Sequence, residues 1–142
     1  MDELREITEK RLRSNAFMQH NHIELEAVEP DRAVFRLKIA PESRNPYGMV
    51  HGGAIYTLAD NATGTAAHTD GRFYVTQTGT LHFLRNQSGG TVRATAWVRH
   101  RGKSTCLLSV DITGENDRLL ATGEFTYFCV DKEIMDRKAP KE

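Results

Sequence analysis

The feature that most constrains this chain is a glycine-rich loop that runs directly into a helical segment, residues 45–60. Pro46 fixes its own φ, whereas Gly48, Gly52 and Gly53 tolerate backbone angles that other residues avoid. From Ile55 onward the apolar side chains recur at helical spacing and fall within an arc of about 100°. The sequence therefore predicts a loop that brings two glycines to a helix N-terminus.

The predicted helix covers residues 54–67 and ends near residues 68–71; it contains no Lys, Arg or Glu, which indicates that it is covered on most sides. Asp60 lies off its apolar stripe, and an acid on a covered helix costs free energy unless it is paired or used. Free N–H groups and the helix dipole at this N-terminus could stabilise an oxyanion, and a nearby carboxylate could act as base or nucleophile. The simpler interpretation also stands: Gly-Gly is common turn chemistry, and a helical Asp is usually solvated.

The size and charge of the chain exclude several classes of protein. Its 142 residues predict one domain, which would bury about 70% of the unfolded surface. Nineteen basic and nineteen acidic residues cancel, so we expect no nucleic-acid partner. No apolar run approaches the roughly 18 residues of a membrane span, and the charged N-terminus is unlike a signal peptide; we expect no membrane partner and a cytoplasmic location. Cys106 and Cys129 are expected to be buried free thiols.

Most of the remaining chain alternates polar and apolar residues with the period of a β-strand. Strands are predicted at residues 22–28, around Phe35 to Ile39, and at 72–85, 91–101, 104–113 and 119–130. In the third of these, one face is expected to carry Tyr74, Thr76, Thr78, Thr80 and His82. A short helix is predicted within residues 1–16 and a frayed tail at 131–142. The prediction is a single α+β domain, residues 1–142, in which an antiparallel sheet of five or six strands wraps around one long central helix.

One run of residues matches a family pattern: Asn45-x-x-Gly48-x-x-His51-Gly52-Gly53, then Leu58 and Asp60. The chain resembles the hotdog-fold acyl-CoA thioesterases, in particular their phenylacetate-pathway (PaaI-like) branch. The turn at residues 86–90 and the Gly102-Lys103-Ser104 turn also look like that branch. The resemblance covers roughly residues 15–130. His-Gly-Gly alone is a weak signal, but its spacing to the preceding Asn and the following Asp is more specific.

The resemblance implies a role for each matching residue. Gly52 matches the glycine whose N–H polarises the thioester carbonyl, and Asp60 matches the carboxylate that attacks the acyl carbon or activates water. Asn45 matches the polar residue that orients the water or the carboxylate. His51 matches the histidine beside the oxyanion glycine.

Thr76 falls near the family's Ser or Thr that helps to place the water, and Thr78 is the alternative. In this family the site forms between two subunits, with the Asp from one and the glycine and Asn from the other. The resemblance therefore implies a homodimer as the minimal active unit, often paired into a homotetramer.

A second group of residues is expected to contact the substrate. Basic side chains near a turn suit the phosphates of coenzyme A, although an exposed strand face would explain them equally well. Loop residues beside the glycines could line the acyl or pantetheine path, or only pack the loop. These candidate substrate contacts are Gly53, Tyr47, Met49, Arg85, Arg99, Arg101 and Lys103.

The predicted function is hydrolysis of an acyl- or aryl-acyl-CoA thioester. No G-x-S-x-G elbow is present for a serine nucleophile, and only His20 and His22 lie close together, so no metal site and no cofactor beyond the substrate's coenzyme A are expected. Two alternatives remain: a hotdog hydratase or dehydratase acting on 3-hydroxyacyl thioesters through His51 and Asp60, and a non-catalytic acyl-CoA-binding module. Trp97, Phe125 and Tyr127 are expected in the core or at an interface.

Overall fold

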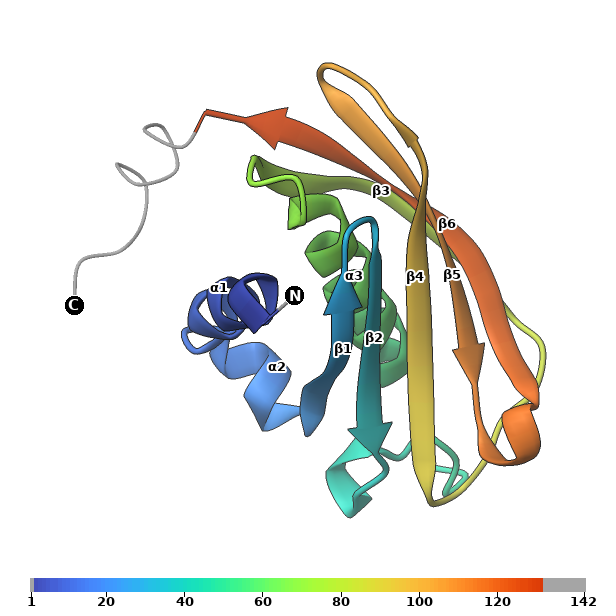
Figure 1. Cartoon of the computed structure of the whole chain (residues 1–142). Coiled ribbons are helices and arrows are strands. Elements are labelled where there is room, and N and C mark those ends of the chain that lie inside the picture. Colours follow the sequence, from blue (N-terminus) through green and yellow to red (C-terminus); the bar gives the residue numbers. More distant parts are fainter. Residues whose placement is uncertain (1, 132–142) are drawn as a thin grey trace.

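In the computed structural model, which describes residues 2–131, an antiparallel six-stranded sheet curves around one long helix, α3 (Gly52–His68) (Figure 1). The strands lie in the order β1-β2-β4-β5-β6-β3, so β1 and β3 form the two edges. Their bounds are β1 Ile23–Glu29, β2 Arg32–Lys38, β3 Phe73–Phe83, β4 Thr91–Arg101, β5 Thr105–Thr113 and β6 Leu119–Val130.

The predicted architecture is confirmed, with six strands and a helix that starts two residues earlier than the apolar spacing indicated. Two predicted strands, 91–101 and 119–130, have the observed bounds. Of the tail predicted to fray, residues 132–142 lie outside the described residues. No helix within residues 2–131 has both the length and the apolar character that a membrane crossing requires.

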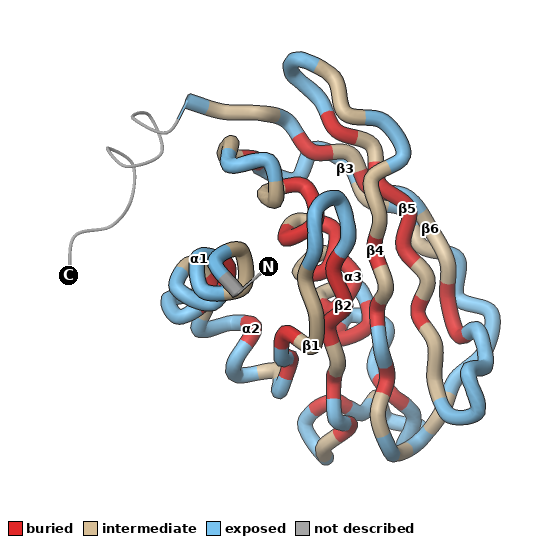
Figure 2. Tube along the Cα trace, viewed as in Figure 1, coloured by how far each residue is buried: buried red, intermediate tan, exposed pale blue. Residues whose placement is uncertain are grey.

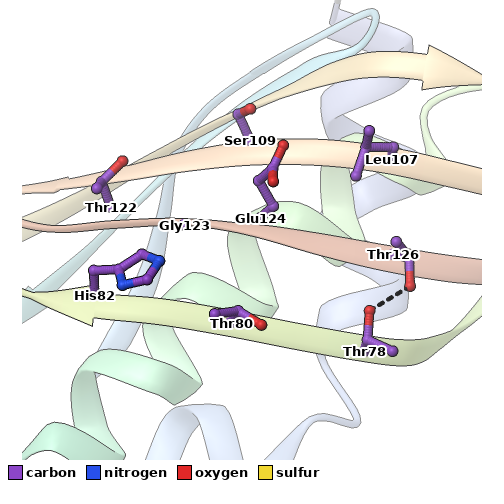
Figure 3. Close-up of a pocket in the computed structure, with 9 residues that line it drawn as sticks. All are labelled: Thr78, Thr80, His82, Leu107, Ser109, Thr122, Gly123, Glu124 and Thr126. Atoms are coloured by element: carbon purple, nitrogen blue, oxygen red, sulfur yellow. Dashed lines mark hydrogen bonds between the residues drawn. The ribbon is translucent and has the colours of Figure 1, made fainter.

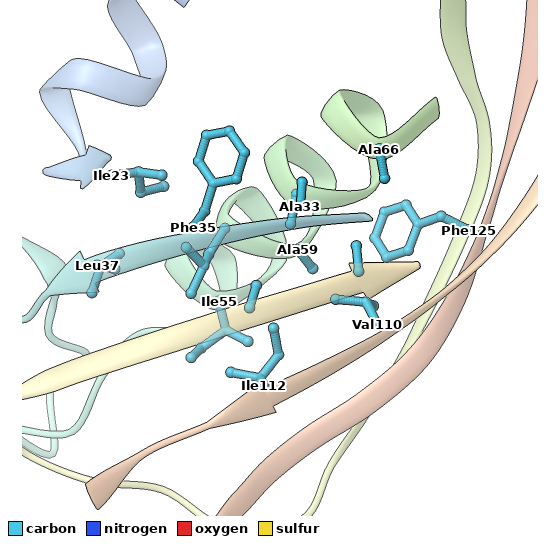
Figure 4. Close-up of a cluster of buried hydrophobic side chains, with 14 of the residues drawn as sticks. Ile23, Ala33, Phe35, Leu37, Ile55, Ala59, Ala66, Val110, Ile112 and Phe125 are labelled. Carbon is cyan, nitrogen blue, oxygen red and sulfur yellow. The ribbon is translucent and has the colours of Figure 1, made fainter. Parts of the chain in front are cut away.

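Small residues allow α3 to lie close to the sheet. Ala59, Ala62 and Ala66 are fully buried, and most of the larger side chains around them come from the strands, among them Phe125 (Figure 4). Alanine favours the helix and leaves room for these strand side chains. Figure 2 shows the result: α3 is largely buried, while the N-terminal helices are largely exposed.

The single helix predicted within residues 1–16 is in fact two helices, α1 (Asp2–Leu12) and α2 (Ala16–His20). The break falls at Asn15, whose Oδ1 accepts a bond from the Met18 N–H and caps α2. Both helices lie beside β1 and α3 (Figure 1). Two short 3₁₀ turns, Pro41–Ser43 and Glu115–Asp117, complete the connections.

Edge strand β3 contains a β-bulge that changes which side chains face the helix. Thr76 pairs with Tyr127 and Thr78 pairs with the next residue, Thr126, so Gln77 is extra. Thr76 therefore faces α3, whereas Thr78 faces outward and bonds to Thr126. The expectation that the five alternating residues from Tyr74 to His82 share one face was wrong, because an inserted residue reverses the alternation after it.

Beyond the bulge, β3 helps to line a hollow on the outer face of the sheet, away from α3 (Figure 3). Hydroxyl-bearing residues of β3, β5 and β6 line it, together with the side chains of His82, Leu107 and Glu124. Of the residues predicted for the active site, this hollow contains only Thr78, the alternative to Thr76.

Gly123 provides a test of the β3–β6 pairing. A Cβ at Gly123 would lie 1.9 Å from the carbonyl oxygen of Thr80, so we expect Gly123→Ala to push the two strands apart. The free energy of unfolding should fall by about 1–3 kcal/mol or more, measured by urea titration with Trp97 fluorescence. Gly89→Ala is the matched control, since a Cβ there meets nothing closer than 4.0 Å. Equal stability of the two variants would contradict this packing.

Candidate active site

Asp60 lies in α3 with its carboxylate held by two hydroxyl groups. The Thr76 hydroxyl donates a hydrogen bond of 2.8 Å to Asp60 Oδ1, and the Tyr127 hydroxyl lies 2.5 Å from the same oxygen. These partners come from β3 and β6, which flank each other at the edge of the sheet. The structure thus resolves the choice between two threonines: Thr76 reaches Asp60 and Thr78 does not.

Tyr127 was expected in the core, and it is only 3% exposed, but its hydroxyl is also part of the candidate site. The group contacts the Asp60 carboxylate, the Asp60 carbonyl oxygen at 2.8 Å and the Thr63 hydroxyl at 2.8 Å. Burial, followed by the nearby negative charge of Asp60, raises the pKa of Tyr127 well above its ordinary value. Tyr127 therefore stays protonated and acts as a donor to the carboxylate.

At the start of α3, the His51 side chain and the two glycines have different hydrogen-bonding roles. His51 is the N-cap, and its Nδ1 accepts a hydrogen bond of 2.8 Å from the Gly53 N–H. A Cβ at Gly53 would lie 3.0 Å from His51 Nδ1, which explains why glycine follows here. The Ala54 and Ile55 N–H groups bond to the His51 carbonyl. The Gly52 N–H makes no hydrogen bond within residues 2–131 and is left as a free donor.

Asn45 shapes the loop before the helix. Its Oδ1 accepts bonds from the Tyr47 and Met49 N–H groups, and its own N–H bonds to the Met49 carbonyl. Tyr47 (88% exposed) and Met49 (39% exposed) lie at the surface of this loop. Within one chain, Asn45 therefore acts on the loop that leads to Gly52, and the two apolar loop residues are left uncovered.

The predicted carboxylate, Asp60, and the predicted oxyanion donor, Gly52, line two separate cavities. Asp60 lines a cavity of about 300 Å³ beside α1, together with Thr76 and Tyr127. Gly52 lines a smaller cavity of about 190 Å³, together with Phe83 and Arg85. The cavities share no residue. Eight residues separate Gly52 from Asp60, about 12 Å along the helix, so one chain does not bring its own Gly52 amide to its own Asp60.

The basic residues predicted to contact coenzyme A lie in different places. Arg101 is 19% exposed at its side chain and donates to the Ala66 and Ala67 carbonyls at the end of α3 and to the carboxylates of Asp31 and Asp70. Arg99 donates to the Ser109 hydroxyl on the outer face. Lys103 is exposed in the β4–β5 turn, and Arg85 alone shares a cavity with Gly52.

His68 at the end of α3 lines the Asp60 cavity as a neutral group. Burial, together with the nearby charge of Arg11, lowers its pKa to about 4. Its Nδ1 lies 2.6 Å from the Gly64 carbonyl, and its Nε2 accepts a bond from the Tyr74 N–H. Both ring nitrogens are therefore occupied, and His68 supports the cavity wall.

Sequence reasoning missed most of the residues that line the Asp60 cavity. Three of them are Arg11 on α1, Asn15 between α1 and α2, and Asn61 on α3. Asn61 follows Asp60 directly in the sequence, and this position could have indicated that Asn61 lines the same cavity. Nothing in the sequence places residues 11 and 15 against a helix some fifty positions later.

Comparison with known proteins agrees with the fold and identifies the family. The family model described as "Thioesterase superfamily" matches residues 47–121, from the loop before Gly52 to β6. The chain is 31% identical over 100 residues to the acyl-coenzyme A thioesterase PaaI of Escherichia coli, covering 70% of this chain and 71% of that protein. It is 32% identical over 108 residues to a 1,4-dihydroxy-2-naphthoyl-CoA hydrolase of Listeria monocytogenes, covering 73% and 87%.

The solved structure of E. coli PaaI superposes on this chain with a TM-score of 0.86, at 25% identity, over 90% of this chain and 94% of that one. The protein therefore belongs to the Thioesterase superfamily, with a hotdog fold of the PaaI-like type. At the level of the family it is an acyl-CoA thioester hydrolase.

His68 makes stability depend on pH. Its pKa is about 4 in the folded chain and about 6.5 when unfolded, so the unfolded chain binds more protons between these values. The free energy of unfolding should therefore fall as the pH drops from 6.5 to 4, and protonation of His68 should account for up to about 3 kcal/mol of this fall. Above pH 6.5, His68 should add nothing further to the pH dependence of the unfolding free energy. His68→Gln should flatten the profile measured by urea titration, whereas the exposed His100→Gln should not. An unchanged slope in His68→Gln would contradict this assignment.

Proposed function

We propose that this protein hydrolyses acyl-CoA thioesters with Asp60 as the base or nucleophile and the Gly52 N–H as the oxyanion donor. One observation carries the proposal: the Gly52 amide is left without a partner at the N-terminus of the same helix that presents a hydroxyl-held carboxylate. Metal ions and cofactors have no part in the proposed reaction, which needs only water and the acyl-CoA.

The proposed chemistry follows from these groups. In the general-base route, Asp60 takes a proton from water as the water oxygen attacks the acyl carbon. The carbonyl oxygen becomes an oxyanion that the Gly52 N–H and the helix dipole stabilise. The C–S bond then breaks, and the proton passes to the departing coenzyme A thiolate. In the nucleophilic route, Asp60 attacks directly, and water hydrolyses the resulting anhydride; the products are the same acid and thiol.

We further propose that the site forms between two copies of the chain. Edge strand β3 pairs only with β6, and four consecutive residues, Val75 to Thr78, are exposed on it. Apolar side chains are exposed nearby, among them Phe83 and α3's Tyr56. A long edge with unpaired backbone groups and exposed apolar side chains favours pairing with another strand. A second copy of β3 would supply that strand by a two-fold axis.

Antiparallel pairing of two β3 strands would bring the two halves of the chemistry together. Thr76, near one end of β3, contacts Asp60, and Phe83, at the other end, lies beside Gly52. In an antiparallel pair, the Thr76 end of one strand lies opposite the Phe83 end of its partner. Asp60 of one chain would then approach Gly52 of the other, which supports the dimeric site implied by the family resemblance.

The substrate class is proposed from the relatives and the cavities. The named relatives act on a coenzyme A thioester, in one case a hydroxylated aryl-acyl-CoA. Arg85 beside Gly52 is the basic residue placed to contact coenzyme A phosphate or pantetheine from the oxyanion side. Lys103 and Arg99 are secondary candidates on the surface, and the two ion pairs of Arg101, together with its hydrogen bonds to the end of α3, favour a structural role for it.

Asp60→Asn should lower kcat for acyl-CoA hydrolysis by about 10²–10⁴-fold, because the base or nucleophile is lost while size and hydrogen bonds are nearly kept. The measurement is thiol release over a panel of aliphatic and aryl acyl-CoAs. Asp117→Asn is the matched control, an exposed acid in the β5–β6 turn. Hydration of crotonyl-CoA without thiol release would support the hydratase alternative. Thermal stabilisation by acyl-CoA without any turnover would support a binding module.

Gly52→Pro tests the oxyanion donor directly. Gly52 is the first helical residue, where proline is well tolerated, and His51 before it has the extended backbone (φ −70°, ψ 134°) that proline requires. The variant removes the N–H and should lower kcat by about 10²–10³-fold. Gly52→Ala keeps the N–H, and its Cβ would lie 3.7 Å from the Phe83 ring, so it should stay active. Equal activity of the two variants would refute the role of the amide.

Mixing the two inactive variants tests the shared site. A mixed dimer of Asp60→Asn and Gly52→Pro chains contains one intact site only if each site takes Asp60 from one chain and Gly52 from the other. Random exchange should then restore about a quarter of the wild-type activity, as expected for two equivalent sites in a two-fold dimer. A site built within one chain would give no recovery. Subunit exchange is checked by mass spectrometry with one isotope-labelled variant.

A further inference from the structure

Arg11 is a half-buried cation in the Asp60 cavity that no acid neutralises within the described residues. Its Nη2 donates one bond of 2.9 Å, to the Thr65 hydroxyl on α3. No carboxylate of residues 3–131 lies within ion-pair distance of it, whereas seven other arginines have such a partner: Arg5, Arg32, Arg36, Arg72, Arg93, Arg99 and Arg101. Burial lowers the pKa of Arg11 because it holds the charge partly out of water. The Tyr127 hydroxyl opposes this shift.

The neighbouring polar groups of the cavity are already occupied. His68 uses both ring nitrogens, as described above. Asn15 Nδ2 bonds to Asn61 Oδ1, and Asn61 Nδ2 bonds to the Thr57 carbonyl. Asn15 Oδ1 accepts the N–H of Met18. A guanidinium has five N–H donors, and Arg11 uses one of them for the bond to the Thr65 hydroxyl. Arg11 is therefore the main source of free donors in this cavity.

The position of Arg11 relative to Asp60 defines which part of a substrate it would meet. Thr65, which anchors the guanidinium, is five residues after Asp60, about 7.5 Å along the axis of α3. Arg85, the proposed contact for coenzyme A, lies beside Gly52 and does not line the Asp60 cavity. With the thioester carbonyl at Asp60 and coenzyme A on the Gly52 side, the acyl group would extend into the partly open cavity beside α1. A phenyl ring with a para substituent, or a chain of about five carbons, spans this distance.

We propose that Arg11 selects acyl groups that carry an oxygen acceptor at their far end, either a carboxylate or a phenolic hydroxyl. This inference rests on the proposed function, because it takes Asp60 as the reacting end of the cavity. The oxygen would receive two N–H bonds from the guanidinium and would compensate its buried charge. Arg11 is a substrate-binding residue in this proposal and takes no part in bond breaking.

The test compares substrates in matched pairs: glutaryl-CoA with pentanoyl-CoA, and 4-hydroxyphenylacetyl-CoA with phenylacetyl-CoA. In at least one pair the oxygen-bearing substrate should have a kcat/KM at least about tenfold higher, since a hydrogen bond to a charged group is worth that factor or more. A preference in the first pair identifies the carboxylate, and a preference in the second identifies the phenol. No preference in either pair would overturn the proposal.

Arg11→Met should abolish that preference by lowering kcat/KM for the oxygen-bearing substrate, and Arg11→Lys should retain part of it. Arg13→Met is the control, an exposed arginine two residues away that does not line the cavity. An equal loss for both members of a pair in Arg11→Met would instead assign Arg11 to packing of α1 and would overturn the proposal.

A binding measurement distinguishes failure of the proposed Arg11 selectivity from failure of the proposed hydrolysis. Isothermal titration of the same pairs into the Asp60→Asn variant, with and without Arg11→Met, measures acyl-group preference without turnover. If the wild type hydrolyses no thioester but this binding preference appears and depends on Arg11, the proposed function fails and the selectivity stands. If hydrolysis proceeds but neither assay depends on Arg11, only the selectivity fails.

Discussion

The close packing of α3 against the concave face of the sheet is the constraint on which the rest of the structure depends. Alanines on the buried side of α3 let the strands approach, and Phe35 and Phe125 fill the space that the small side chains leave. Because the helix lies this close, a residue on its flank can reach β3 and β6 directly. Asp60 is that residue, and its bonds to Thr76 and Tyr127 are a consequence of the helix–sheet distance.

Most of the fold could be predicted from the sequence because its signals are local. The alternation in residues 91–101 and 119–130 fixed two strands, and an apolar stripe without charges identified the covered helix. The helix begins at Gly52 and not at Ala54 because the His51 side chain caps it, an interaction that apolar spacing does not register. The bulge at Gln77 also has no local signal, which is why Thr76 and Thr78 could not be distinguished before the structure.

The parts of the site that could not be predicted are those that depend on contacts between distant segments. Alternation places Tyr127 on the inner face of β6, but only the tertiary structure brings its hydroxyl to Asp60, 67 residues earlier. The same holds for Arg11, which reaches Thr65 across 54 residues. The motif residues His51, Gly52 and Gly53, by contrast, are neighbours in sequence, and the bond from the Gly53 N–H to the His51 ring is a local contact.

Two acids, Asp60 in the middle of α3 and Asp70 just beyond its end, differ in the groups that hold their carboxylates. Asp70 receives hydrogen bonds from Tyr74 and Arg72 and pairs with Arg101; burial opposes them, but together they lower its pKa. Paired with two cations, Asp70 is a weak base and fixes the end of the helix. The hydrogen bonds to the Asp60 carboxylate come instead from two neutral hydroxyls, which orient it without neutralising its charge. Under the proposed function, this difference in partners favours Asp60 over Asp70 as the reacting carboxylate.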